Sequence, residues 1–158
     1  MRKKAQKQRV LAAMDGHLVP PDVIRSTCVG GEICFAIRPL GATLYAPAEG
    51  VLAESGEDGF LLYIGGGARL RLSFSAARAG APPLGGVHLN ALVEPGAPLR
   101  AGQVLAHLEH AAPSSQAVLL TKVQYHGHIR FCRAAPLLSG GRTAVLLLQT
   151  EGWRIPRP

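Results

Sequence analysis

Short apolar runs separated by glycine and proline turns recur along the chain and predict a structure built from strands. The clearest run spans residues 69–75, where Leu70, Leu72 and Phe74 alternate with arginine and serine. A period of two places the apolar side chains on one face of a strand and the polar side chains on the other. No segment longer than about ten residues has a convincing helical period. We therefore expect an all-β, single-domain antiparallel β-sandwich or barrel.

The other apolar runs are also short and bounded by turn residues, so we expect each of them to contribute a strand. They lie at residues 10–19, 33–37, 44–45, 51–53, 60–64, 87–93, 104–108, 118–123, 128–131 and 143–149. Asp58-Gly59 and Gly65-Gly66-Gly67 are typical of hairpin turns, because glycine adopts the positive φ that such turns need. Residues 118–123 and 128–131 are close enough in sequence to form an additional hairpin around His126-Gly127.

The distribution of charge argues against a nucleic-acid-binding domain. The formal net charge of the 158 residues is +7, but five of the 17 basic side chains precede the first apolar run. The rest of the chain is nearly balanced, with 12 basic against 10 acidic side chains. We expect residues 1–9 to form a mobile basic arm, residues 10–150 to form the β domain, and residues 151–158 to form an irregular tail.

The cysteines and the length of the apolar runs indicate a cytoplasmic protein. Cys28, Cys34 and Cys132 are odd in number and have no CxxC spacing, which predicts neither a disulfide framework nor a thiolate zinc site. The first apolar run is too short for a signal peptide, and residues 144–148 are too few to cross a bilayer. We expect no stable membrane insertion, no nucleic-acid partner and no cofactor.

Three stretches of sequence have the order and spacing of a known family. The first opens with G-H-L-V-P at residues 16–20 and continues with G-G-E-I-C-F-A-I-R-P at residues 30–39. The second is L-Y-A-P-A-E-G-V at residues 44–51, and the third is V-E-P-G-A-P-L-R-A-G-Q-V-L at residues 93–105. Together they resemble the glucose-type IIA components of the bacterial sugar phosphotransferase system. The resemblance implies the IIA fold, also called the duplicated hybrid motif, with residues 110–141 as an insertion.

The resemblance also implies phosphoryl transfer through two histidines, and both positions hold other residues here. The first histidine of the family would fall on Asp58 or Gly59, and the second on Ser73. Glycine has no side chain, and a serine hydroxyl needs an adjacent general base to act as a nucleophile. We therefore expect the phosphocarrier step to be lost, unless another histidine takes one of these positions.

Partners of the family dock on a shallow apolar face around the histidines, and they include other phosphotransferase-system or regulatory proteins. In this chain the same face would carry Arg69, Arg71, Ser73 and Ser75 instead. Arg71 could bind an anion there, because a guanidinium group forms charge-assisted hydrogen bonds. Protein binding or regulation without phosphotransfer is the first functional hypothesis, and a purely structural module is the competing one.

A metal site is an alternative, because zinc peptidases of the lysostaphin type share the same hairpin core. They end with an H-x-H strand, which His126 and His128 match. Side chains at i and i+2 of a strand point the same way, so both imidazoles could meet one metal ion. The earlier H-x-x-x-D ligands of these peptidases fall on Gly31 and Phe35, which bind no zinc, so the site would be degenerate.

A biotinyl or lipoyl carrier is a second alternative that shares the hairpin core. Such carriers need a lysine on a hairpin tip for the prosthetic group. The one lysine after Lys7 is Lys122, which lies inside an apolar run rather than in a turn.

Overall fold

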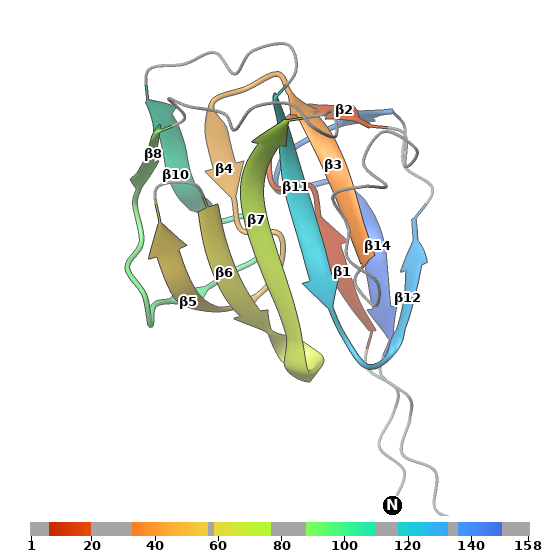
Figure 1. Cartoon of the computed structure of the whole chain (residues 1–158). Coiled ribbons are helices and arrows are strands. Elements are labelled where there is room, and N and C mark those ends of the chain that lie inside the picture. Colours follow the sequence, from red (N-terminus) through yellow and green to blue (C-terminus); the bar gives the residue numbers. More distant parts are fainter. Residues whose placement is uncertain are drawn as a thin grey trace, which may run out of the picture.

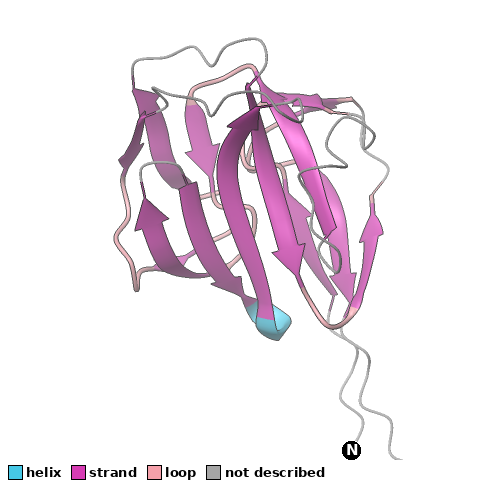
Figure 2. Ribbon diagram, in the orientation of Figure 1, coloured by secondary structure: helices cyan, strands magenta, loops and turns pink. Residues whose placement is uncertain are grey.

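Strands make up almost all of the regular structure. The computed structural model describes residues 7–19, 33–56, 59–76, 88–109, 117–132 and 136–149. In this part of the chain the helical element is a single 3₁₀ turn, η1 (Gly65–Gly67), which joins two long strands (Figure 2). Nothing within these ranges is a helix of the length and apolar character needed to cross a membrane. The expected all-β fold is confirmed.

Among the described residues, the largest sheet has eight strands in the order β13-β2-β3-β11-β7-β6-β5-β9 (Figure 1). Its strands are β2 (Gly16–Leu18), β3 (Ile33–Pro39), β5 (Gly50–Gly56), β6 (Gly59–Ile64), β7 (Ala68–Ala76), β9 (Pro98–Leu99), β11 (Ala117–Gln124) and β13 (Leu137–Leu138). Two smaller sheets have the orders β1-β14-β12 and β4-β10-β8. They contain β1 (Lys7–Leu11), β4 (Thr43–Tyr45), β8 (His88–Ala91), β10 (Val104–Glu109), β12 (His128–Phe131) and β14 (Ala144–Gln149).

The strand order is the same in two halves of the molecule. Reading outward from the centre of the large sheet gives β11-β3-β2-β13 on one side and β7-β6-β5-β9 on the other. Each half also has one small three-stranded sheet, β1-β14-β12 or β4-β10-β8. The halves meet where β7 pairs with β11, and the register there places Leu72 opposite Thr121. Leu72 pairs with Phe60 and Thr121 with Phe35, so this position is equivalent in both halves.

A short sequence repeat accompanies this symmetry. Residues 11–18 read L-A-A-M-D-G-H-L, and residues 45–52 read Y-A-P-A-E-G-V-L. The two segments exchange backbone hydrogen bonds, from Leu11 N–H to the Pro47 carbonyl (2.7 Å) and from Tyr45 N–H to the Ala13 carbonyl (2.6 Å). Reciprocal bonds of this kind tie equivalent positions of the two halves together at the centre of the molecule.

The main hydrophobic core serves both halves, and a smaller buried group of Val19, Cys34, Ala36, Val118 and Leu120 lies apart from it. The predicted alternation of β7 is confirmed, since Leu70 and Leu72 are fully buried while Arg69 and Arg71 are exposed. The corresponding inward side chains of the other strands complete the same cluster, among them Val10, Phe35, Ile37, Leu44, Leu52, Phe60, Leu62, Leu105, Leu119, Val123 and Leu146. The exception is Thr121, which is also fully buried and has a hydroxyl without a hydrogen-bond partner among the described residues.

Several sequence-based expectations need correction. Residues 118–123 and 128–131 form no hairpin with each other, because β11 pairs with β3 and β7 whereas β12 pairs with β14. The basic arm expected over residues 1–9 extends too far, because Lys7 and Arg9 lie in β1 and pair with β14. The rest of that arm, residues 1–6, and the tail at 151–158 lie outside the described residues.

The region expected to be an insertion, residues 110–141, supplies a central strand. Its strand β11 lies between β3 and β7 and buries Leu119 and Val123 in the main core. That the region is longer than the family of the resemblance needs stays a prediction. What it contributes here is indispensable to the sheet, since β11 is half of the seam between the two halves.

The cysteines differ from the expectation. Cys34, on β3, is disulfide-bonded, whereas Cys132 is free. The sequence-based expectation that no disulfide forms is therefore wrong for Cys34.

We expect Thr121→Val to stabilise the protein. The substitution removes a buried hydroxyl that has no partner and keeps the branched shape of the side chain, so the free energy of unfolding should rise by about 1 kcal/mol. Urea denaturation followed by circular dichroism measures the change. The matched control is Thr143→Val, because the Thr143 hydroxyl accepts a hydrogen bond from the Ser139 N–H (2.9 Å). A gain in Thr143→Val as large as in Thr121→Val would contradict the argument.

Two turns, one from each half, touch each other through glycines. Gly102 has φ of +83° and Gly141 has φ of +71°, a conformation that residues with a Cβ rarely adopt. A Cβ on Gly102 would also lie 3.0 Å from the carbonyl oxygen of Gly141. Gly96 has a similar φ of +92° but nothing within 4 Å of a Cβ. Gly96 therefore isolates the backbone effect from the contact between the turns.

We expect Gly102→Ala to lower the free energy of unfolding more than Gly96→Ala does. The left-handed backbone alone should cost about 1 kcal/mol in each variant, and the contact with Gly141 adds to that cost only in Gly102→Ala. Parallel urea titrations of the two variants measure the difference. Equal losses would show that the two turns do not restrain each other.

Candidate functional site

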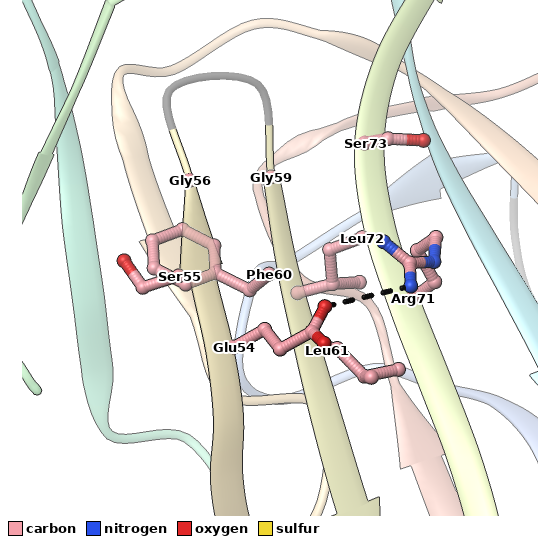
Figure 3. Close-up of a pocket in the computed structure, with 9 residues that line it drawn as sticks. All are labelled: Glu54, Ser55, Gly56, Gly59, Phe60, Leu61, Arg71, Leu72 and Ser73. Atoms are coloured by element: carbon pink, nitrogen blue, oxygen red, sulfur yellow. Dashed lines mark ion pairs between the residues drawn. The ribbon is translucent and has the colours of Figure 1, made fainter. Parts of the chain in front are cut away.

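A hollow of about 330 Å³ opens on the outer face of β5, β6 and β7 (Figure 3). It lies on the side of the sheet opposite the main core, near the end where β5 turns back into β6. Nine residues line it: Glu54, Ser55, Gly56, Gly59, Phe60, Leu61, Arg71, Leu72 and Ser73.

The hollow exists because one row of the sheet lacks large side chains. Gly56 lies opposite Gly59, and Gly59 lies opposite Ser73, so two glycines and a serine follow one another across three strands. The next outward row consists of Glu54, Leu61 and Arg71 and rises beside it. Residues opposite each other in a ladder point to the same face, so the first row forms the floor and the second row forms a wall.

An irregularity in β5 sets which of its residues face the hollow. The register shifts between Leu52 and Glu54, which leaves Ala53 unpaired and reverses the alternation of the strand beyond it. Leu52 points into the core, and Glu54 reaches the outer face two residues later. Figure 3 shows the Ser55 hydroxyl directed away from Arg71, so Ser55 contributes backbone rather than a polar side chain to the wall.

The charged groups of the hollow form one loose ion pair. Arg71 Nη2 lies 3.8 Å from Glu54 Oε2, across the Leu61 side chain between them (Figure 3). The two side chains are 53% and 68% exposed, so water screens their attraction strongly. The pair therefore contributes little to stability and can exchange for other partners.

The residues placed at the family's histidine positions are brought together only in part. Gly59 and Ser73 are direct neighbours in the β6–β7 ladder, as the resemblance implies for the two histidines. Asp58 lies outside the described residues. A Cβ on Gly59 would clash with the carbonyl oxygen of Leu72, so a side chain at this position would require the strands to shift.

None of the described residues that line the hollow is a histidine. The histidines whose side chains the structure describes lie on other elements: His17 is on β2, His107 on β10, His126 in the bend before β12, and His128 on β12. His107 forms a contact of 3.3 Å with the Thr43 hydroxyl on β4. The described part of the chain thus offers no imidazole to the hollow.

The predicted binding face is extended by apolar side chains that the sequence analysis missed. Arg69 and Arg71 are exposed and Ser73 is half-buried, as expected for an outward row, while the side chain of Ser75 lies outside the described residues. Tyr63 is opposite Arg69, whose guanidinium carbon lies 5.4 Å above the tyrosine ring. We call this surface the β5–β7 face and define it as Val51, Glu54, Leu61, Tyr63, Arg69, Arg71 and Ser73.

The metal pair proposed from the sequence does not share a strand. His126 lies in the bend before β12, and only His128 belongs to that strand, opposite Gln149. The expectation that both imidazoles project from one strand is therefore wrong. Among the residues that the structure describes, no three His, Cys, Asp or Glu side chains gather into a group that could hold a metal ion.

The lysine considered for a prosthetic group is not at a hairpin tip. Lys122 lies within β11, opposite Cys34 on one side and Arg71 on the other, and is half-buried. A swinging arm attached at this position would start from the middle of the sheet, where neighbouring strands restrict it.

The strand order and the two paired halves give a β-sandwich, and comparison with solved structures makes it a fold of the IIA type. Glucose permease IIA from Mycoplasma capricolum has a similar structure, with a TM-score of 0.61 over 92% of this chain and 96% of that chain. The two sequences are 18% identical over this region, a level at which the likeness establishes the fold alone. No protein-family model and no curated protein matches the chain.

We expect the Glu54–Arg71 pair to contribute almost nothing to folding. In a double-mutant cycle with Glu54→Gln and Arg71→Gln, the coupling energy should be below about 0.5 kcal/mol, because both groups are more than half exposed. Urea titrations of the two single variants and the double variant give this value. A coupling above about 1 kcal/mol would mean that the pair is structural.

Proposed function

We propose that this chain is a IIA-like domain that has no phosphocarrier activity and acts by binding other proteins through the β5–β7 face. Its partners in this proposal are phosphotransferase-system or regulatory proteins in the cytoplasm. The cytoplasmic location rests on the resemblance to IIA components, although a disulfide such as that at Cys34 is more common in oxidising compartments.

The composition of the hollow supports the loss of phosphotransfer. Phosphoryl transfer through histidine needs a neutral ring nitrogen that attacks phosphorus, and the floor of the hollow has Gly59 and Ser73 instead. Near neutral pH the Ser73 hydroxyl is a weak nucleophile unless a general base removes its proton. Among the residues that the structure describes, the one carboxylate lining the hollow is that of Glu54, and it is directed at Arg71 rather than at Ser73 (Figure 3).

The mixture of side chains around the hollow supports protein binding over small-molecule catalysis. Val51 is 42% exposed and Tyr63 is 47% exposed, which places apolar surface beside two arginines. Tyrosine and arginine are the side chains that most often dominate protein interfaces.

Phosphotransfer is tested by incubating the chain with labelled phosphoenolpyruvate and the general phosphotransferase proteins. We expect no label above background, because no imidazole among the described residues faces the hollow. A IIA domain that has both histidines serves as the positive control in the same mixture.

Two outcomes would contradict the loss of phosphotransfer. One is an acid-labile label, which identifies a phosphohistidine. The other is an acid-stable label that disappears in Ser73→Ala, which would identify Ser73 as the acceptor.

A further inference from the structure

The charges of the β5–β7 face and of the neighbouring strand β11 are unbalanced. The outward rows of β5, β6, β7 and β11 contain four described charged side chains, namely Glu54, Arg69, Arg71 and Lys122. Three are cations and one is an anion. Lys122 lies opposite Arg71 across the β7–β11 ladder, so two like charges are neighbours in the sheet. Two cations opposite each other repel, which is unfavourable. An anion placed beside them attracts both and offsets this repulsion.

The cations differ in how firmly they are held. Arg69 lies 5.4 Å above the Tyr63 ring, an arrangement that restrains the guanidinium without neutralising its charge. Arg71 has a carboxylate at 3.8 Å, and both members of that pair are mostly in water. A carboxylate supplied from outside can replace Glu54 at Arg71 at small cost, because the internal pair is weak.

From this arrangement we infer that the partner of the β5–β7 face is an acidic protein surface, with a carboxylate that competes with Glu54 for Arg71. This inference rests on the proposed binding function and specifies its partner by charge. A second carboxylate of the partner is attracted by the positive charges of Arg69 and Lys122. Apolar side chains of the partner cover Val51, Leu61 and Tyr63, which lie beside the two arginines on β5 and β6.

An acidic protein fits this face better than a nucleic acid does. A phosphate backbone is contacted by runs of cations with few acidic interruptions. Here Glu54 lies in the same row as Leu61 and Arg71, and three of the seven residues of the face are apolar. A folded protein can place a hydrophobic group against the apolar residues and keep its carboxylates for the arginines, whereas phosphates recur at fixed spacing.

Selection from a random twelve-residue peptide library, displayed on phage and captured by the full chain, tests the inference. We expect the enriched peptides to combine aspartate or glutamate with leucine or aromatic residues. An enriched peptide is then synthesised and titrated against the chain and its variants. Binding should weaken at least about tenfold in Arg69→Gln/Arg71→Gln and tighten about threefold in Glu54→Gln.

Arg142→Gln provides the matched control, because Arg142 is an exposed arginine in a turn of the other half. It removes one positive charge, as Arg71→Gln alone does, and should leave peptide binding unchanged. Equal weakening in Arg142→Gln and Arg71→Gln would overturn the inference, because it would reflect net charge rather than this face. Enrichment of basic or uncharged peptides would overturn it directly.

A competition experiment with DNA tests whether the face binds nucleic acid instead of an acidic protein. A single-stranded twelve-nucleotide DNA that displaces the peptide, and that itself loses binding in Arg69→Gln/Arg71→Gln, would overturn the acidic-protein inference in favour of nucleic acid. The phosphotransfer assay is independent of these measurements. A labelled chain would contradict the proposed function, whereas an unlabelled chain that selects no acidic peptide would contradict this inference alone.

Discussion

The pairing of β7 with β11 is the constraint on which the rest of the structure depends. Eight residue pairs, from Ala117 opposite Ala76 to Gln124 opposite Arg69, join two halves of the same strand order into one sheet. Neither half covers its own apolar face, since one core contains buried side chains of both halves. Long-range pairing of this kind costs chain entropy, which the shared core offsets.

The position of β6 and β7 inside the sheet also explains why the candidate site is rigid and shallow in shape. β6 and β7 lie inside the sheet and are paired on both sides, so the surface they present is rigid and its shape follows from side-chain size alone. The hollow is a place where Gly56, Gly59 and Ser73 leave space, and its chemistry comes from Glu54 and Arg71 beside it. A site formed this way suits recognition of a preformed surface better than closure around a small substrate.

Structural features that depend on neighbouring residues in the sequence were mostly predicted, and features that depend on residues far apart in the sequence mostly were not. The alternation around Leu70 is local, so the buried and exposed faces of β7 followed from it, as did the positions of Arg69 and Arg71. The place of β11 between β3 and β7 did not, because strand pairing between distant segments leaves no local pattern. The irregularity at Ala53 reversed the direction of Glu54 and hid it from a period-two analysis. The repeat of residues 11–18 in 45–52 was visible in the sequence and would have indicated the two halves.

The pairing of β1 with β14 brings Lys7 opposite Gln149, so the first and last described strands are immediate neighbours. In Figure 1 the start of β1 and the end of β14 lie together at the lower end of the molecule. A protein module attached through β1 or β14 would therefore start from one common point. A short peptide between the same two points would close the chain into a ring.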